Sequence, residues 1–326
     1  MASIAQRIIL CILVTWSLHA SSTVVEAASW SYRDDATGPS NWTYLAPTCG
    51  GSEQSPINIV PSDVVEKNLG SFTLVGFGDA DDVPEGATME AANNGHGLVV
   101  TMSGDYMVSG AGLGETAYKA VQFHFHWGSE SGQGSEHTID GQEFPAEMHI
   151  VCYNTKYDSF YASLDKKDGL TVLGFMLSIQ SDDNPAFQPL YTAFSGLTFE
   201  GNTFNLPEPL AFASLLPEGF ESSYYRYSGS LTTPTCNEIV TWNVFKEPIM
   251  VSESQMGVFR DKFANELGHG ENMTLTNTYR PPQPLNNRVV STNAGDQSNG
   301  ATSVSSLAAV SSLTMAVVCL MATALS

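Results

Sequence analysis

Two short runs of the sequence carry histidines at a spacing that could hold a metal ion. Residues 119–127 read Lys-Ala-Val-Gln-Phe-His-Phe-His-Trp, and residues 146–152 read Ala-Glu-Met-His-Ile-Val-Cys. Side chains alternate between the two faces of a strand, so His124 and His126 point the same way. If the two runs are neighbouring strands, His149 completes a three-imidazole site. Catalytic zinc uses three protein ligands and keeps a fourth position open to water.

The same alternation gives each run an apolar face and an opposite face that carries the histidines. In the first run the apolar face is expected to carry Val121, Phe123, Phe125 and Trp127. Gln122 and Glu147 each stand two residues before a histidine on its own face, where a side-chain oxygen can accept the second ring N–H. Cys152 points away from His149, so we interpret it as a small buried hydrophobe rather than a ligand. The 128–143 segment is long enough to connect the runs as an antiparallel pair.

Short β-type runs bounded by Gly, Asn, Asp and Pro dominate the rest of the chain. Besides the two histidine runs, we predict strands over 97–102, 171–179 and 238–244. No linker or internal repeat interrupts residues 28–290. The sequence therefore predicts a single, mostly β domain with peripheral helices, of the α+β class.

One helix is expected over 252–267. Ser252 and Gln255 form a capping-box pair at its start, and Gly268 provides a stop at its end. Between these signals the apolar residues recur at helical spacing, as Met256, Phe259, Phe263 and Leu267.

The chain is strongly acidic. Its 326 residues include 13 Lys and Arg against 34 Asp and Glu, a formal net charge of −21. Nucleic acid is bound by basic surfaces, so we expect no nucleic-acid partner. A hydrophobic content of 42% is enough for a substantial core and argues against extended disorder.

The N-terminus has the layout of a secretory signal. Arg7 precedes an apolar run over 8–18, and small residues follow near Ala27, so residues 1–27 are predicted to be a signal peptide. In an exported protein, Asn41 and Asn272 would be glycosylation acceptors of the Asn-X-Thr type.

The C-terminus resembles an anchoring signal. A polar, low-complexity stalk over 291–306 precedes a hydrophobic tail over 307–326, the layout of a GPI-attachment signal. A single transmembrane helix is the alternative, but no basic residue follows Leu307 as its cytoplasmic flank would require. We expect a protein that is secreted or held by a lipid anchor on the outer membrane leaflet, at the extracellular face of the plasma membrane.

Cysteine usage agrees with export. Cys11 and Cys319 lie in the segments expected to be removed, which leaves Cys49, Cys152 and Cys236. Exported proteins tend to pair their thiols, and one of these three must stay unpaired within the chain.

Several segments together resemble the alpha-class carbonic anhydrases in order and spacing, from about Trp30 to Arg288. They are Gln-Ser-Pro-Ile-Asn-Ile (54–59), Asn-Asn-Gly-His-Gly (93–97), the histidine run through Gly128 with Gly-Gln-Gly-Ser-Glu-His-Thr (132–138), Ala-Glu-Met-His (146–149), Gly-Ser-Leu-Thr-Thr-Pro (229–234) and Tyr-Arg-Pro-Pro-Gln-Pro-Leu (279–285). The resemblance implies a twisted, mainly antiparallel sheet of about ten strands with zinc at the bottom of a conical cleft. It also implies an enzyme that reversibly hydrates carbon dioxide to bicarbonate and a proton.

The resemblance further implies the roles of single residues. His124, His126 and His149 would be the zinc ligands, with zinc-bound hydroxide attacking carbon dioxide. Thr232 would accept a hydrogen bond from that hydroxide, and Glu136 would take the proton of Thr232.

Other matching positions surround this centre. His96 would be the shuttle that exports the proton, since a histidine can exchange protons near neutral pH. Tyr32 and Asn94 would belong to the water network leading to it. The wall beside the substrate would consist of Val151, Val172, Leu231, Thr233 and Trp242.

A few positions depart from the family pattern or add to it. Val99 stands where a polar amide is common, and Thr278-Tyr279 replaces Asn-Trp, although a backbone carbonyl there should still contact His126. His137 is interpreted as structural. Cys49 and Cys236 stand where exported members carry a disulfide.

Two further functions remain compatible with this sequence. The fold could serve as a binding module for adhesion or mineral contact, or the site could hydrolyse activated esters as a side reaction. All three histidines and Thr232 are present, which favours the enzyme. No sequence feature indicates an oligomeric state.

Overall fold

Fifteen strands and five α-helices form the part of the chain that the computed structural model describes, residues 30–33 and 35–293. The strands are β1 (Asn58–Ile59), β2 (Val65–Lys67), β3 (Phe72–Val75), β4 (Thr88–Asn93), β5 (Leu98–Ser103), β6 (Met107–Gly110), β7 (Tyr118–Trp127), β8 (Thr138–Ile139), β9 (Ala146–Asn154), β10 (Leu170–Gln180), β11 (Thr203–Asn205), β12 (Tyr224–Gly229), β13 (Val240–Phe245), β14 (Ile249–Ser252) and β15 (Ser291–Asn293). The helices are α1 (Trp42–Leu45), α2 (Phe160–Ser163), α3 (Gln188–Ser195), α4 (Phe212–Leu215) and α5 (Glu253–Arg260).

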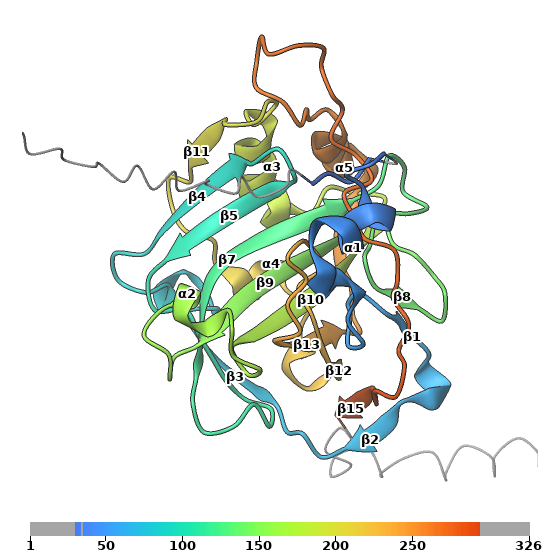
Figure 1. Ribbon diagram of the computed structural model, residues 1–326. Coiled ribbons are helices and arrows are strands. Elements are labelled where there is room, and N and C mark those ends of the chain that lie inside the picture. The colour runs from blue at the N-terminus through green and yellow to red at the C-terminus, as the bar shows by residue number, and fades with distance from the viewer. Residues whose placement is uncertain (1–29, 34, 294–326) are drawn as a thin grey trace, which may run out of the picture.

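Thirteen of these strands form one sheet (Figure 1). Its main path has the order β11-β4-β5-β7-β9-β10-β13-β12-β15-β2, and β3, β6 and β14 attach beside it. Most neighbours are antiparallel, whereas β10 runs parallel to β13 and β14, and β15 runs parallel to β2. The prediction of a mainly antiparallel sheet of about ten strands is confirmed.

The sheet is covered on both faces, and β10 shows this directly. Leu173, Phe175 and Leu177 belong to one buried cluster, whereas Val172 and Met176 belong to another. A strand that is buried on both faces has a nearly continuous run of apolar residues in its sequence. Each fully buried large apolar side chain contributes about 1.5–3 kcal/mol to stability. Burial on both faces therefore stabilises the sheet beneath the histidines.

The central pair of strands is β7 and β9, which are antiparallel as expected, with His124 directly opposite His149. The alternation in β7 is broken at Val121 by a register shift between Ala120 and Gln122. Such a bulge places an extra residue in one strand and reverses the facing of the residues beyond it. Ala120 rather than Val121 therefore joins the buried core, and the expected position of Val121 was wrong.

Helix α5 is shorter than the predicted 252–267. Its capping box is present: the Ser252 side chain accepts from the Gln255 N–H, and the Gln255 side chain accepts from the Ser252 N–H. The helix ends at Arg260 because the next residues find backbone partners elsewhere. The Phe263 N–H donates to the Thr198 carbonyl at 2.8 Å. These tertiary hydrogen bonds override the helical spacing of the apolar residues.

The C-terminal boundary of the domain also differs from the prediction. Ser291–Asn293 forms β15 between β12 and β2, so the polar stalk does not begin at Ser291. These short polar side chains give no strand signal, because the pairing is made by the backbone. The signal peptide (1–27) and the hydrophobic tail (307–326) lie outside the described residues. Within those residues, no helix is both long enough and apolar enough to cross a membrane.

Candidate metal centre

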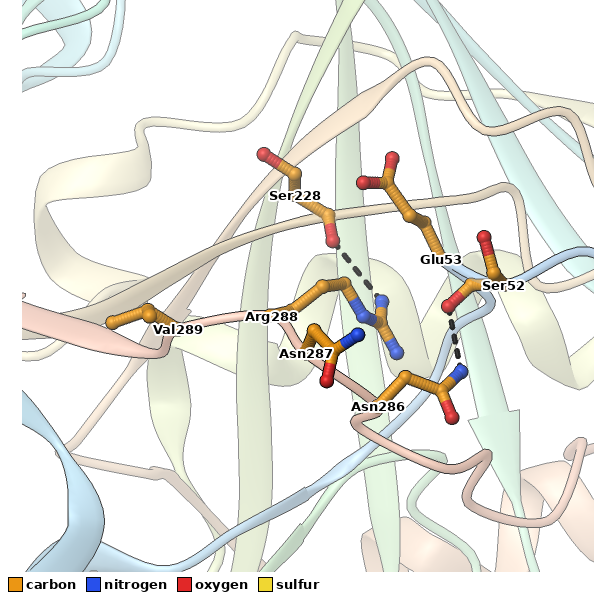
Figure 2. Close-up of a pocket in the computed structure, with 7 residues that line it drawn as sticks. All are labelled: Ser52, Glu53, Ser228, Asn286, Asn287, Arg288 and Val289. Atoms are coloured by element: carbon orange, nitrogen blue, oxygen red, sulfur yellow. Dashed lines mark hydrogen bonds between the residues drawn. The ribbon is translucent and has the colours of Figure 1, made fainter.

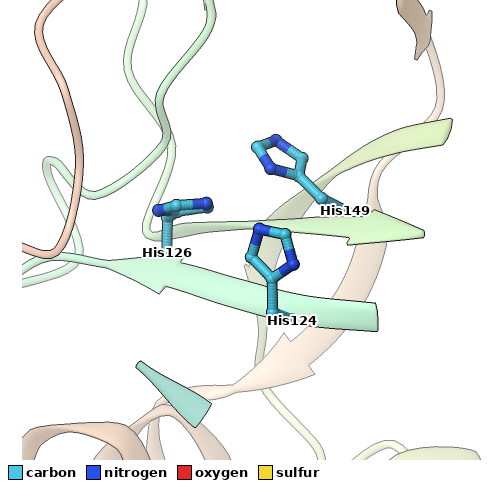
Figure 3. Close-up of side chains that lie close together, drawn as sticks. All are labelled: His124, His126 and His149. Carbon is cyan, nitrogen blue, oxygen red and sulfur yellow. The ribbon is translucent and has the colours of Figure 1, made fainter. Parts of the chain in front are cut away.

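Three imidazole rings converge above the middle of the sheet (Figure 3). His124 and His126 project from β7, and His149 projects from β9. The ring centroids are 5.0 Å apart for His124 and His126, 5.2 Å for His124 and His149, and 4.7 Å for His126 and His149. One nitrogen of each ring lies within 4.8 Å of those of the others. This is the set that the alternation along the two strands predicted.

The second nitrogen of each ring is held by a hydrogen bond, and this fixes the ring orientation. The three bonds run from His124 Nδ1 to Gln122 Oε1 at 2.9 Å, from His126 Nδ1 to the Thr278 carbonyl at 2.6 Å, and from His149 Nε2 to Glu147 Oε1 at 2.7 Å. The nitrogens left to face one another are therefore Nε2 of His124, Nε2 of His126 and Nδ1 of His149.

These free nitrogens fit a zinc ion. His126 Nε2 is buried and has no hydrogen-bond partner within residues 30–33 and 35–293. Burial lowers the pKa of His124 well below its ordinary value, lowers that of His126 to about 3, and lowers that of His149. The rings are thus neutral, and neutral imidazole is the form that binds zinc.

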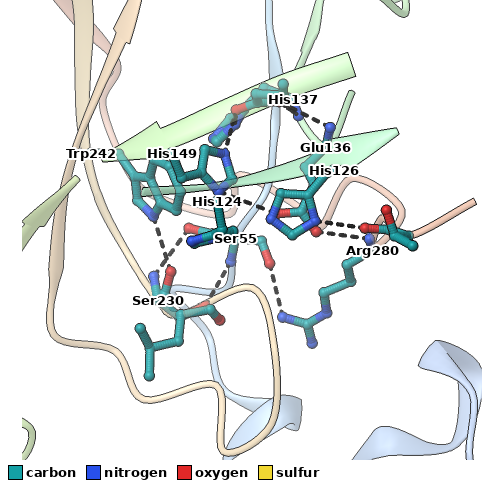
Figure 4. Close-up of polar contacts among 12 residues, drawn as sticks. Ser55, His124, His126, Glu136, His137, His149, Ser230, Trp242 and Arg280 are labelled. Carbon is teal, nitrogen blue, oxygen red and sulfur yellow. Dashed lines mark hydrogen bonds and ion pairs between the residues drawn. The ribbon is translucent and has the colours of Figure 1, made fainter. Parts of the chain in front are cut away.

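A second cluster of potential ligands, His137, Glu147 and His149, is already committed to internal hydrogen bonds (Figure 4). His137 Nδ1 and His149 Nε2 each donate to Glu147 Oε1 at 2.7 Å. The backbone N–H groups of Glu136 and His137 donate to Glu147 Oε2 at 2.9 and 2.8 Å. All three side chains are buried. The second nitrogen of His137 is also engaged, with the Tyr227 hydroxyl at 2.6 Å. This cluster therefore supports the metal centre, and the imidazole nitrogen it leaves free is Nδ1 of His149, which faces His124 and His126.

Glu136 lies next to the free imidazole nitrogens. Its Oε1 accepts from the Arg280 N–H at 2.9 Å, and its Oε2 is 3.3 Å from His126 Nε2. Burial raises the pKa of Glu136 well above its usual range, while hydrogen bonding with Thr232 and Arg280 lowers it. Thr232 is buried and near enough to act on this carboxyl, although no hydrogen bond of good geometry joins the two side chains.

The expected apolar wall is assembled on the same face of the sheet. Val151, Val172 and Trp242 are buried in one cluster, and Leu231 packs against it. The Trp242 ring lies 4.7 Å from the His149 ring, centroid to centroid. The Trp242 indole N–H donates to the Ser230 carbonyl at 2.9 Å, which holds the ring beside the histidines.

A cavity of about 170 Å³ opens beside the metal centre. Its lining includes the predicted site residues Tyr32, Asn94, His96, Gln122, His124, His126 and Thr233, together with Trp30 and Val99. The structure therefore brings the expected shuttle and two of the expected ligands, His124 and His126, to one cavity. Val99 adds to the apolar part of this lining, to which Trp30 and Phe125 also belong.

The loop that carries His96 is shaped by Asn94. The Asn94 side-chain oxygen accepts from the backbone N–H groups of His96 and Gly97 at 3.0 and 2.9 Å. Gly95 has φ +80, a left-handed conformation that suits glycine. The Asn94-Gly95 pair thus turns the chain so that His96 reaches the cavity.

Cys49 and Cys236 form the disulfide that the resemblance implied. Arg280 connects it to the metal centre, because its Nη2 donates to the Cys49 carbonyl at 2.9 Å while its backbone N–H donates to Glu136. Cys152 is buried and has no disulfide partner among the described residues, and burial raises its pKa beyond the usual range of a thiol.

Sequence reasoning missed two contributors to the site. Trp30 stacks on His96, but a lone tryptophan near the domain start carries no recognisable signal. Arg280 was noted only as part of a matching motif, and its contact with Glu136 is made through the backbone. His137 was interpreted as structural, and its bond to Glu147 agrees with that interpretation.

Three neutral imidazoles presented by adjacent strands of a mainly antiparallel sheet are typical of zinc enzymes that activate water. The family model described as eukaryotic-type carbonic anhydrase matches residues 37–294. The chain belongs to this family of enzymes, and the alpha-class resemblance is confirmed.

Named relatives span most of the chain. Carbonic anhydrase 15 of Mus musculus is 35% identical over 299 residues, which cover 89% of this chain and 90% of the relative. Carbonic anhydrase 7 of Homo sapiens is 40% identical over 268 residues, covering 80% and 96%. Carbonic anhydrase 4 of Rattus norvegicus is 36% identical over 274 residues, covering 81% and 84%.

Proposed function

We propose that this chain is a zinc enzyme that reversibly hydrates carbon dioxide to bicarbonate and a proton. Membership of the carbonic anhydrase family supports this reaction. One observation carries the proposal: three imidazole nitrogens face one another, while the second nitrogen of each ring is already held by a hydrogen bond. Zinc held by His124, His126 and His149 would lower the pKa of water and so supply a nucleophilic oxygen at neutral pH.

Thr232 and Glu136 would orient the nucleophile. The Thr232 hydroxyl has a single proton, and donating it to the Glu136 carboxylate leaves its oxygen free to accept a hydrogen bond from the attacking oxygen. That bond would turn a lone pair of the attacking oxygen toward the substrate carbon, and such positioning lowers the barrier. The Arg280 N–H, 2.9 Å from Glu136 Oε1, holds the carboxyl group in place.

The apolar wall would bind carbon dioxide. The substrate is small and apolar overall, so burial against Val151, Val172, Leu231 and Trp242 attracts it without demanding hydrogen bonds. Thr233 lines the cavity beside the histidines and would contact the more polar product.

His96 would carry the released proton to the solvent. It lines the same cavity as His124 and His126, and burial lowers its pKa from 6.5. The ring is therefore neutral at physiological pH and ready to accept a proton. Tyr32, whose ring centroid lies 6.3 Å from that of His126, and Asn94 would line the path of the proton.

Metal analysis and activity together test this function. We expect one equivalent of zinc in the purified protein and rapid carbon dioxide hydration that aromatic sulfonamides block. His149→Ala should abolish both the bound zinc and the activity. His269→Ala is a matched control, because its side chain is 74% exposed and remote from the ligands. Full hydration activity in the His149→Ala protein would refute the site.

We further propose that the enzyme acts outside the cell, because its two terminal segments have the layout of an export signal and an anchoring signal. The proposal includes a signal peptide over 1–27, a GPI anchor directed by 307–326, and glycans at Asn41 and Asn272. Asn272 is exposed, as a glycan requires. Treatment of expressing cells with a phosphatidylinositol-specific phospholipase should release the activity into the medium. Activity that stays with the membranes would favour a transmembrane segment.

A further inference from the structure

A second cavity, of about 400 Å³, shares no lining residue with the cavity at the metal centre. Figure 2 shows the residues that line it. It is formed by Ser52 and Glu53, by Ser228 on β12 and by residues 286–289. None of these residues belongs to the proposed site. The proposed function therefore leaves this cavity without a role.

A positively charged and a negatively charged side chain line the cavity without forming an ion pair with each other. Arg288 and Glu53 both line it, and within the described residues the Arg288 guanidinium donates to backbone carbonyls and forms no ion pair with Glu53. They nevertheless lie close enough to interact. Burial lowers the pKa of Arg288, and Glu53 is among the groups that act against this effect. A guanidinium and a carboxylate that share a cavity but do not touch leave room for a ligand between them.

Both groups keep unused hydrogen-bonding capacity. The Arg288 guanidinium has five N–H donors. Three are directed at the Leu285, Ser228 and Pro284 carbonyls, at 3.0, 3.0 and 2.8 Å. These bonds hold the group rigidly and leave two donors free. The Glu53 carboxylate accepts no hydrogen bond from any described residue, although the Glu53 backbone N–H donates to Glu238 at 2.7 Å.

The charge pattern selects the kind of ligand. A simple anion would meet Arg288 but would be repelled by Glu53 and by the net charge of −21. A simple cation would meet Glu53 but would be repelled by Arg288. A molecule with both charges satisfies both groups. The Asn287 amide, which has no side-chain hydrogen bond within residues 35–293, adds a donor and an acceptor to the lining of the cavity.

We propose that this cavity binds a small zwitterion of the amino-acid class, with its carboxylate on Arg288 and its ammonium group on Glu53. The guanidinium recognises a carboxylate through paired N–H donors. This site is independent of the proposed reaction, because none of its residues contacts the three histidines.

Binding can be measured without using catalysis. The probes are glycine, β-alanine and 4-aminobutyrate, which carry the same two charges at increasing separation, and acetate and methylammonium, which carry one charge each. Each is titrated into the ¹⁵N-labelled, zinc-loaded protein with an aromatic sulfonamide filling the metal site, so that only other sites respond. The readout is the backbone amide shift of Glu53 and residues 286–289. At least one zwitterion should saturate and bind about tenfold or more tightly than either singly charged probe.

Glu53→Gln gives the decisive variant, because this side chain makes no hydrogen bond that folding needs. It should weaken zwitterion binding about tenfold or more and leave acetate binding no weaker. Glu115→Gln, at an exposed position outside the cavity, is the matched control and should bind as the unmodified protein does. The proposal is overturned if acetate binds as tightly as every zwitterion, if Glu53→Gln changes nothing, or if no zwitterion saturates up to about 0.1 M.

Discussion

The imidazole of His96 lies parallel to the indole of Trp30, with ring centroids 3.9 Å apart and ring planes 10° apart. Trp30 is held in turn by edge-on contacts with Tyr32 and Trp42, at centroid distances of 5.3 and 5.2 Å. The aromatic group beneath His96 both fixes its position and shields it from water. Burial lowers the pKa of His96 from its ordinary value of 6.5. The stacking of Trp30 on His96 therefore helps to set the pH at which the proposed shuttle gains and loses its proton.

Removing the shield should raise the pKa of His96. In Trp30→Ala the ring becomes accessible to water, so its protonated form is stabilised and its pKa moves up toward 6.5. The hydration rate in weak buffer rises with pH as the shuttle loses its proton, and this rise should shift to higher pH. NMR titration of His96 measures the pKa directly. Trp30→Phe keeps an aromatic face and is the control; equal pKa values in all three proteins would contradict the account.

The same shift makes stability depend on pH. The pKa of His96 is lower in the folded protein than in the unfolded chain, so the unfolded chain binds the proton more readily. As pH falls below 6.5, this histidine should therefore reduce the free energy of unfolding. His96→Gln cannot take up that proton and should lose less stability over the same range. Denaturant unfolding at pH 7.5 and pH 5.5 measures the difference, and parallel losses in both proteins would rule it out.

Removal of the imidazole should slow proton export selectively. In weak buffer, His96→Ala is expected to lower the hydration rate on the order of 100-fold, because a positioned proton carrier contributes about that much. Added imidazole should restore most of the rate by carrying the proton itself. His269→Ala removes an exposed histidine and should behave as the unmodified enzyme. A rate in weak buffer that does not change would dismiss the shuttle.

The alternation of side chains in two strands was enough to predict the three converging rings and the two oxygens that hold His124 and His149. That pattern is local, and the sheet preserves it between Gln122 and Trp127. The bulge at Val121 could not be predicted, because it depends on how the neighbouring strand pairs. The early end of α5 likewise reflects distant backbone partners, and β15 is a strand only because β12 and β2 lie beside it.

Glu147 is expected to control zinc affinity without touching the metal. Its Oε1 accepts from both His149 and His137, and its Oε2 accepts two backbone N–H groups. An amide offers one acceptor oxygen in place of two, so Glu147→Gln must leave donors unpaired and let the His149 ring turn. Such changes usually cost about 10–100-fold in metal affinity. Competition with a chelator measures this loss, with the exposed Glu143→Gln as control. Equal zinc affinity in the two variants would show that Glu147 does not orient the ligand.

The disulfide should contribute to both stability and catalysis. Cys49 and Cys236 are separated by 187 positions, and a cross-link across such a loop restricts the unfolded chain by about 5 kcal/mol on the entropy model, an upper value. Replacing both by Ser should lower the free energy of unfolding by up to that amount. Denaturant unfolding measures it, and the buried, unpaired Cys152→Ala is the control for loss of a cysteine.

The effect on catalysis follows from where the bridge ends. The Cys236 N–H donates to the Thr233 carbonyl at 2.8 Å, and the Cys236 carbonyl accepts from the Gln54 side chain at 3.2 Å. Without the bridge, the loop bearing Thr232 keeps only noncovalent contacts, among them these two hydrogen bonds and the one from the Asn237 side chain to the Leu164 carbonyl at 3.0 Å. The double variant should therefore lose kcat while it keeps its zinc, because the histidines stand on the sheet. If it lost zinc and activity in equal measure, the loop would not be the part that the disulfide positions.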